Sequence, residues 1–133
     1  MGATKGSVLI VDDERVVLDI GRKILEEFGY EVSLAESGEQ ALEIVRGQPR
    51  GFDLVMLDLG MPGIGGAACL VELKKGFPYL KVVVCTGSDA GLADWAIEEG
   101  ADAVLPKPYR MSSLMALVEK ALAGGPHPGE NAV

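Results

Sequence analysis

Five short runs alternate along the chain with longer segments of helical periodicity, and this alternation restricts the fold more than any other feature. Most of the runs are rich in Val, Leu and Ile on consecutive positions, as is typical of strands buried on both faces. They occupy residues 8–11, 31–35, 54–57, 82–85 and 103–105. Because helical segments separate them, the strands are expected to lie parallel and to be joined by right-handed crossovers. The sequence thus predicts an α/β fold with a doubly wound, five-stranded parallel sheet and five helices.

The first helix is expected from residue 14 to a stop at Gly29, because apolar residues follow spacings of three and four in this segment. The spacing predicts which face of the helix is turned to the core. That face consists of Val17, Ile20, Ile24 and Phe28.

The other helices carry start and stop signals of their own. Ser37, with Gln40 three positions later, has the spacing of a capping box and begins the second helix. Pro78 ends the third helix near residue 77, and the fourth covers about residues 92–99. Ser112 or Ser113 is expected to cap the last helix.

The length and charge of the chain indicate one acidic domain. The 133 residues include 12 basic and 20 acidic ones, which gives a net charge of −8. This charge argues against binding to nucleic acid phosphates or to an anionic membrane. We expect one domain over residues 7–123, with a flexible N-terminus at 1–6 and a flexible tail or linker at 124–133.

The two cysteines, Cys69 and Cys85, show no metal-binding spacing and are expected to be small buried hydrophobic residues. No apolar run is long enough to span a bilayer, and the N-terminus lacks the apolar region of a signal peptide. These observations predict a cytoplasmic protein.

Chemically active side chains stand where four of the predicted strands end. They are Asp12, Asp13, Asp58, Thr86 and Lys107. The carboxyl ends of parallel strands meet at one edge of the sheet, where ligands bind in this class of fold. Each residue alone has an ordinary explanation as a helix cap, a turn residue, a strand residue or a surface lysine. Their joint placement favours a functional site.

The composition of this edge predicts phosphoryl chemistry. Three neighbouring carboxylates repel one another and favour a cation, and oxygen ligands suit Mg²⁺, Mn²⁺ or Ca²⁺. Lys107 and the Thr86 hydroxyl would hold phosphoryl oxygens while a carboxylate attacks phosphorus in line. Gly60 and Gly87 would let backbone amides approach the phosphoryl group. This is the chemistry that forms an aspartyl phosphate.

Four segments match a known family in order and spacing. They read VLIVDDE at 8–14, LVMLDLGMPGIGG at 54–66, VVVCTG at 82–87 and GADAVLPKP at 100–108. With these segments the chain resembles the receiver domain of two-component response regulators over about residues 7–123. The resemblance implies a flavodoxin-like fold with strand order 2-1-3-4-5. It also implies that a phosphohistidine of a histidine kinase donates the phosphoryl group.

The resemblance further implies a role for each site residue. Asp58 would be the phosphoacceptor, Thr86 the switch hydroxyl and Lys107 the phosphate-binding lysine. The implied cofactor is Mg²⁺, and its ligands would be Asp12, Asp13, Asp58 and the main-chain carbonyl of Gly60.

Three positions depart from the family's pattern. Val104 stands where many receivers have an aromatic side chain that turns inward, and Gly65 stands where an aspartate is frequent. Pro106 removes a backbone donor just before Lys107, which an edge strand tolerates. The bond between Lys107 and Pro108 is usually cis in this family.

We therefore expect a phosphorylation switch in which modification of Asp58 changes partner binding. The alternative is a phosphorylation-independent docking module on the same fold, which Val104 favours. The intact site residues favour the switch, because a module freed from phosphotransfer has no chemical need for all five of them. A metal-dependent phosphohydrolase would need a cap domain, for which this chain has no room. We expect no enzymatic activity beyond the domain's own phosphorylation and dephosphorylation.

The expected partners are proteins, with no direct contact to nucleic acid or membrane. A histidine kinase or phosphotransfer protein would act upstream and a protein target downstream. Trp95 and Tyr109 are candidates for a docking patch, since aromatic residues are enriched at interfaces. The chain is expected to be a stand-alone regulator or a receiver from a longer protein such as a hybrid kinase, and a monomer or weak dimer.

Overall fold

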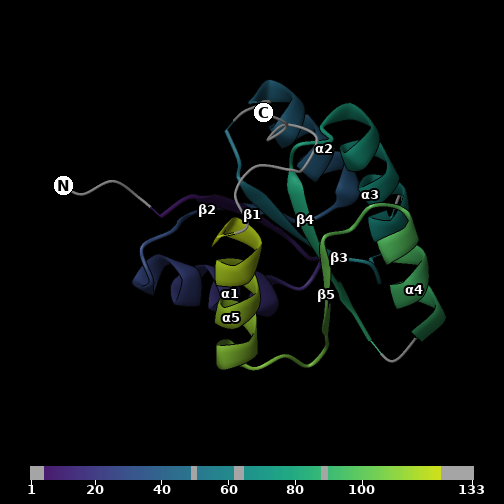
Figure 1. The fold of residues 1–133 in the computed structure, drawn as a ribbon. Helices are drawn as coiled ribbons and strands as arrows, with labels where there is room; N and C mark the ends of the chain where they lie inside the picture. Colours follow the sequence, from purple (N-terminus) through teal and green to yellow (C-terminus); the bar gives the residue numbers. More distant parts are fainter. Residues whose placement is uncertain (1–4, 49–50, 62–64, 88–89, 124–133) are drawn as a thin grey trace.

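The structure, a computed structural model, describes residues 5–48, 51–61, 65–87 and 90–123. Its strands are β1 (Ser7–Val11), β2 (Glu31–Ala35), β3 (Leu54–Asp58), β4 (Lys81–Thr86) and β5 (Ala103–Pro106). They form one parallel sheet in the order β2-β1-β3-β4-β5 (Figure 1). The predicted fold class and strand order are confirmed.

Helices cover both faces of the sheet. They are α1 (Arg15–Glu27), α2 (Gly38–Gly47), α3 (Gly65–Gly76), α4 (Ala90–Glu98) and α5 (Met111–Ala123). One core lies between the sheet and α2, α3 and α4, and a second lies between the sheet and α1 and α5 (Figure 1). Alternate strand residues serve the two cores: Leu9 and Val11 face the first, and Val8 and Ile10 face the second. The central strands are buried on both faces, which explains their unbroken apolar runs.

The predicted inner face of α1 is wrong except for Ile24. The buried residues of this helix are Leu18, Gly21, Ile24 and Leu25, whereas Ile20 is 54% exposed. The reason is the close approach that Gly21 permits, because a Cβ at this position would lie 3.0 Å from Cδ1 of Ile10. The helix contacts the sheet through this glycine, and apolar side chains on its other face, such as Ile20 and the C-cap residue Phe28, are therefore left facing solvent.

The start of α2 confirms the predicted cap, and the start of α5 does not. The Gln40 N–H donates to Oγ of Ser37 at 3.1 Å, and Oε1 of Gln40 accepts from the Glu36 N–H at 2.7 Å. Helix α5 instead begins at Met111, and the Leu114 N–H donates to the carbonyl of Arg110 at 3.0 Å. Ser112 and Ser113 are thus inside the helix rather than at its cap.

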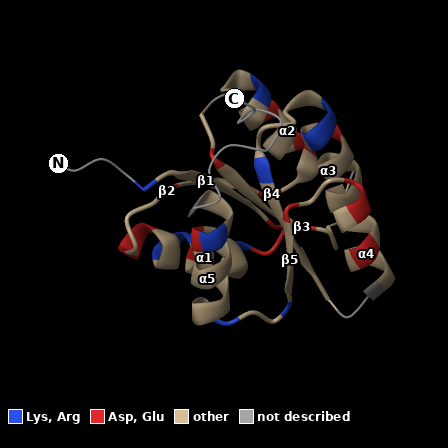
Figure 2. Ribbon diagram, in the orientation of Figure 1, with Lys and Arg blue, Asp and Glu red and all other residues tan. Residues whose placement is uncertain are grey.

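Charged residues lie mainly in helices and loops, while the strands are mostly free of charge except near their ends (Figure 2). Strand β5 is an edge of the sheet, as the proline at its end requires. Among the described residues, no helix is both long and apolar enough to cross a membrane.

The predicted flexible tail, residues 124–133, and residues 1–4 of the predicted flexible N-terminus lie outside the described residues. At the boundary, the Lys5 N–H donates to the Gly29 carbonyl, and the Glu31 N–H donates to the Gly6 carbonyl, each at 2.9 Å.

Candidate functional site

Parallel register brings the ends of four strands to one edge of the sheet. Val11 pairs with Leu57, and Asp58 pairs with Cys85. The backbone pairing continues past the strand ends, since the Asp12 N–H donates to Ala35 O at 3.1 Å and the Lys107 N–H to Thr86 O at 2.7 Å. All five residues that the strand ends predicted therefore stand at this edge.

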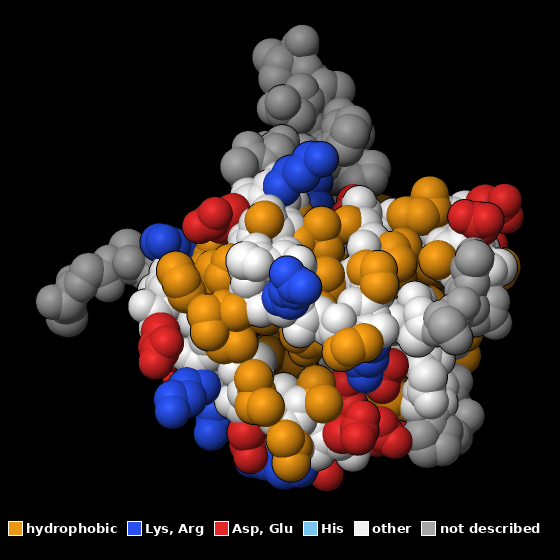
Figure 3. Space-filling view, turned by 90° about the horizontal axis from the view of Figure 1, so that it is seen from below, with side chains coloured by type: hydrophobic (Ala, Val, Ile, Leu, Met, Phe, Trp, Pro, Cys, Tyr) orange, Lys and Arg blue, Asp and Glu red, His pale blue; other side chains and the backbone are white. Residues whose placement is uncertain are grey.

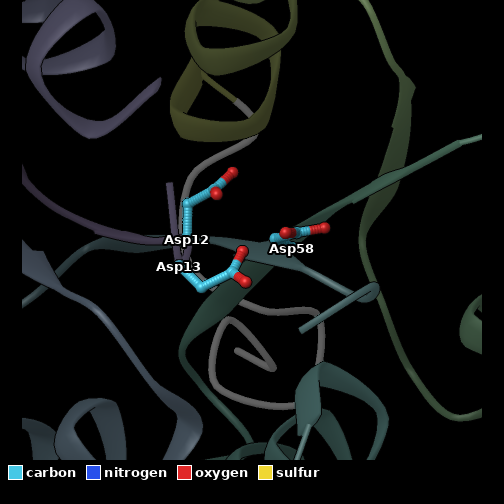
Figure 4. A group of neighbouring side chains, drawn as sticks. All are labelled: Asp12, Asp13 and Asp58. Atoms are coloured by element: carbon cyan, nitrogen blue, oxygen red, sulfur yellow. The ribbon is translucent and has the colours of Figure 1, made fainter. Parts of the chain in front are cut away.

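Three carboxylates form the centre of the site. One oxygen from each of Asp12, Asp13 and Asp58 lies within 4.8 Å of the others. Asp12 and Asp13 come from the segment after β1, and their carboxylates project to the side on which Asp58 lies (Figure 4). Asp12 and Asp58 are buried, at 2% and 7% exposure, whereas Asp13 is exposed. Three acidic groups at this spacing repel one another, so the arrangement needs positive charge.

Lys107 supplies positive charge from the protein itself. Its Nζ lies 2.8 Å from Oδ2 of Asp12 and 3.3 Å from Oδ2 of Asp58. Burial alone would lower the pKa of Lys107, but the hydrogen bond to Asp12 and the charges of Asp58 and Asp12 outweigh it and raise the pKa above its ordinary value. The ammonium group therefore stays charged and ties β5 to β1 and β3.

The second oxygen of each buried carboxylate is held by the backbone. Oδ1 of Asp12 accepts from the Glu14 N–H at 2.9 Å, and Oδ1 of Asp58 accepts from the Gly60 N–H at 3.0 Å. These short-range bonds fix the two side chains so that their Oδ2 atoms meet Lys107. The alternative role of Asp12 and Asp13 as helix caps does not hold, because the cap residue of α1 is Glu14 and no side chain caps it.

Thr86 and Gly60 complete the rim. Thr86 is 4% exposed at the end of β4, and within the part of the chain that the structure describes its hydroxyl donates to the Gly87 carbonyl at a long distance of 3.4 Å. Gly60 is exposed, and a Cβ there would lie 3.5 Å from Oδ1 of Asp58. The Thr86 hydroxyl is thus weakly bound by the described residues, and no side chain at residue 60 covers Asp58.

The donor set fits a divalent cation. Carboxylate oxygens are hard ligands of the kind that Mg²⁺ prefers, and three of them converge here together with the backbone turn at Gly60. One of the three, Asp13, is exposed, which gives an ion access from solvent.

An apolar hollow borders the site, and the sequence reasoning missed it. It has a volume of about 380 Å³ and is lined by Glu14, Val17, Ile20, Lys107, Pro108 and Tyr109. Figure 3 shows hydrophobic side chains gathered around a hollow on the face seen from below. The signal in the sequence is the pair Val17 and Ile20 on α1, whose spacing predicts that they face the core.

The predicted patch of Trp95 and Tyr109 is divided between two faces. Trp95 packs against the core under α2, α3 and α4, whereas Tyr109 packs against the core under α1 and α5. Tyr109 follows the cis bond between Lys107 and Pro108, which confirms that expectation. Burial raises the pKa of Tyr109 to about 12, so its phenol is neutral near pH 7.

Comparison with known proteins identifies similar chains. The family model for the response regulator receiver domain matches residues 8–119. The transcriptional regulatory protein ZraR of Escherichia coli K12 is 42% identical over 117 residues, covering 87% of this chain and 26% of ZraR. The DNA-binding transcriptional regulator NtrC of the same strain is 32% identical over 120 residues, covering 90% of this chain and 25% of NtrC. The chain thus spans about a quarter of the length of these relatives.

Solved structures show the same arrangement of the whole domain. A response regulator receiver domain protein from Clostridium thermocellum aligns with a TM-score of 0.85 and 33% identity, covering 89% of this chain and 94% of that one. The receiver domain of NtrX from Brucella abortus aligns with a TM-score of 0.81 and 34% identity, covering 87% and 98%.

Lys107→Ala is expected to destabilise the metal-free protein, because it leaves two buried carboxylates without their ammonium partner. Breaking a fully buried pair costs about 3–5 kcal/mol, and the partial exposure of Lys107 reduces this to about 1–3 kcal/mol. Urea unfolding in the presence of a chelator measures the loss. Lys75→Ala, at an exposed lysine of α3, is the matched control, and equal midpoints for the two variants would contradict the ion-pair account.

The two thiols are expected to be unreactive in the native protein. Burial raises the pKa of Cys69 and of Cys85 to about 12, so the thiolate fraction at pH 8 is about a thousandfold below that of a free cysteine. Mass spectrometry after treatment with iodoacetamide should show no adduct on folded protein and two in urea. Rapid labelling of the folded chain would show that these side chains are accessible.

Proposed function

Because this chain belongs to the response regulator receiver domain family, we propose that it is a phosphoacceptor in a two-component phosphorelay, with Asp58 taking the phosphoryl group from a histidine kinase phosphohistidine. The observation that carries the proposal is the convergence of Asp12, Asp13 and Asp58 on Lys107 at one edge of the sheet. This arrangement supplies a nucleophile together with positive charge for phosphoryl oxygens.

The residues of the site would divide the transfer step among them. An oxygen of Asp58 attacks phosphorus in line, an O–P bond forms, and the N–P bond to the donor histidine breaks. The Gly60 N–H on Oδ1 fixes the carboxylate during the attack. Lys107, already within 3.3 Å of Asp58, would meet the new phosphoryl oxygens, and the Thr86 hydroxyl, whose bond to the Gly87 carbonyl is long, would donate to another.

The cofactor we propose is Mg²⁺, held by Asp12, Asp13, Asp58 and the main-chain carbonyl of Gly60. When bound, it would neutralise negative charge on the phosphoryl oxygens. Asp12 also forms an ion pair with Lys107, since its Oδ2 lies 2.8 Å from the lysine Nζ. The Lys107 ammonium is thus positioned at the site before a phosphoryl group arrives.

The donor would dock at the apolar hollow beside Asp58. Lys107 belongs both to the hollow and to the carboxylate cluster, so a protein seated there reaches the phosphoacceptor. Ile20 at the hollow and Val16 on the same helix are 54% and 69% exposed. We propose that apolar side chains of the histidine-bearing protein cover them, because the donor must contact this rim to deliver its phosphoryl group.

The remaining functional assignments follow from the same proposal. The domain would act in the cytoplasm and catalyse only its own phosphorylation and dephosphorylation. The output would pass to a protein target or to further domains of a longer chain. The alternative, a docking module that works without phosphorylation, is favoured by Val104, which is partly buried and leaves no aromatic side chain at that position to follow Thr86. The intact carboxylate cluster and Lys107 favour the phosphoacceptor.

Incubation with a small phosphoryl donor such as acetyl phosphate should add one phosphoryl group to the intact protein. The addition should require Mg²⁺ and should be absent from Asp58→Asn. Intact-protein mass spectrometry measures it. An adduct that persists in Asp58→Asn would remove Asp58 from the role, and no adduct with several donors and Mg²⁺ present would favour the docking module.

Ile20→Asp should slow phosphoryl transfer from the histidine-bearing donor by about tenfold or more, because it places a charge in an apolar contact. Transfer from acetyl phosphate should be unchanged, since the substitution lies outside the carboxylate cluster. Ile97→Asp is the matched control, at 50% exposure on α4. If the two variants accept phosphoryl groups from the protein donor at equal rates, the donor does not use the hollow.

A further inference from the structure

Gly66, in the first turn of α3, lies against the backbone that carries Asp58. A Cβ at residue 66 would overlap the carbonyl oxygen of Asp58 and would lie 2.6 Å from Cα of Leu59 and 2.8 Å from the carbonyl carbon of Asp58. All three are backbone atoms, so no side-chain rotation relieves the overlap. Only glycine lets the start of α3 approach the end of β3 this closely.

The close approach is specific to this glycine within α3. Gly65 has a φ of +74°, which lets the chain turn into the helix, but a Cβ there would meet nothing within 4 Å. Gly76, in the last turn, also has nothing within 4 Å of an added Cβ. Residue 66 must therefore be glycine because a side chain would overlap the backbone of Asp58 and Leu59, and residue 65 favours glycine because of its positive φ. Neither reason applies at residue 76.

The turn after Asp58 is held from more than one side. The Leu59 N–H donates to the Cys85 carbonyl of β4 at 3.0 Å, and the Gly60 N–H donates to Oδ1 of Asp58 at 3.0 Å. The backbone of Gly66 packs against the Asp58 and Leu59 backbone from α3. Since β4 is a central strand of the sheet, a displacement forced at Gly66 must move either the start of α3 or the turn over residues 58–60.

We propose that Gly66 is a positioning residue for Asp58. By admitting the first turn of α3 against the Asp58–Leu59 peptide, it sets where the Asp58 carboxylate and the Gly60 carbonyl stand relative to Asp12 and Lys107. This inference rests on the proposed function for its effect on phosphorylation, but its effect on cation binding is independent of it.

Gly66→Ala tests the proposal, with Gly76→Ala as the matched control in the same helix. We expect Gly66→Ala to weaken Mn²⁺ binding about 10- to 100-fold and to slow phosphorylation by acetyl phosphate about 100-fold, as displacements of about an ångström do. Gly76→Ala should match the wild type in both. Electron paramagnetic resonance of free Mn²⁺ gives the affinity, and circular dichroism confirms folding. Wild-type affinity and rate in folded Gly66→Ala would overturn the proposal.

If Gly66→Ala does not fold, amide hydrogen exchange on the wild type tests whether Gly66 positions Asp58. Coupling between two sites is reciprocal, so Mg²⁺ bound at the carboxylates should slow exchange of the Cys69 and Leu70 amides, which bond to Gly65 and Gly66 by helix geometry. The amides near Gly76 should not respond. Unchanged exchange at Cys69 and Leu70 under saturating Mg²⁺ would overturn the proposal.

Phosphorylation and cation binding separate the two hypotheses. If the wild type and Gly76→Ala take no phosphoryl group while Gly66→Ala still weakens Mn²⁺ binding, the proposed function fails and the positioning role stands. If the wild type is phosphorylated and folded Gly66→Ala equals it in both measurements, the positioning role fails alone.

Discussion

The ion pairs of Lys107 with Asp12 and Asp58 are the interaction on which the rest of the site depends. They join residues that are 95 and 49 positions apart in sequence and link the ends of three strands. The carboxylates would otherwise repel one another in a poorly solvated edge, so the ammonium makes the acidic cluster compatible with a folded domain. It also leaves a charged donor beside Asp58, ready for an anionic group. The same ion pairs of Lys107 thus offset the repulsion between the carboxylates and place a positive charge beside Asp58.

Backbone constraints make that contact possible. Parallel pairing fixes which residues follow each strand at the common edge, and glycines fix how closely the helices approach. Gly21 lets α1 rest on Ile10, and Gly66 lets α3 rest on the Asp58–Leu59 peptide. The first approach leaves Ile20 facing solvent beside the site, and the second places α3 against the turn that carries Asp58. Glycines therefore shape the surroundings of Asp58 from both α1 and α3.

Most of the fold, and the placement of the five candidate residues at one edge of the sheet, could be predicted because both depend on sequence periodicity and on where the strands end. Buried parallel strands show unbroken apolar runs, and their ends must share an edge, which placed Asp58 and Lys107 together. The orientation of α1 could not be predicted, because apolar residues lie on two of its stripes and a glycine contact selects Leu18 over Ile20. The predicted cap of α5 was wrong because the helix begins at Met111, one residue before Ser112, so both serines lie inside its first turn. Gly66 gives no periodic signal, since its role is visible only when α3 is placed against β3.

The most direct test of the account is to identify the phosphorylated residue chemically. Treatment of phosphorylated protein with borohydride reduces an acyl phosphate to the corresponding alcohol, and tandem mass spectrometry locates the change in the sequence. The account predicts homoserine at position 58 and nowhere else, at a yield that follows the phosphoryl group measured on the intact protein. Reduction at Asp12 or Asp13, or a stable phosphoryl group on a hydroxyl side chain such as Thr86, would contradict it.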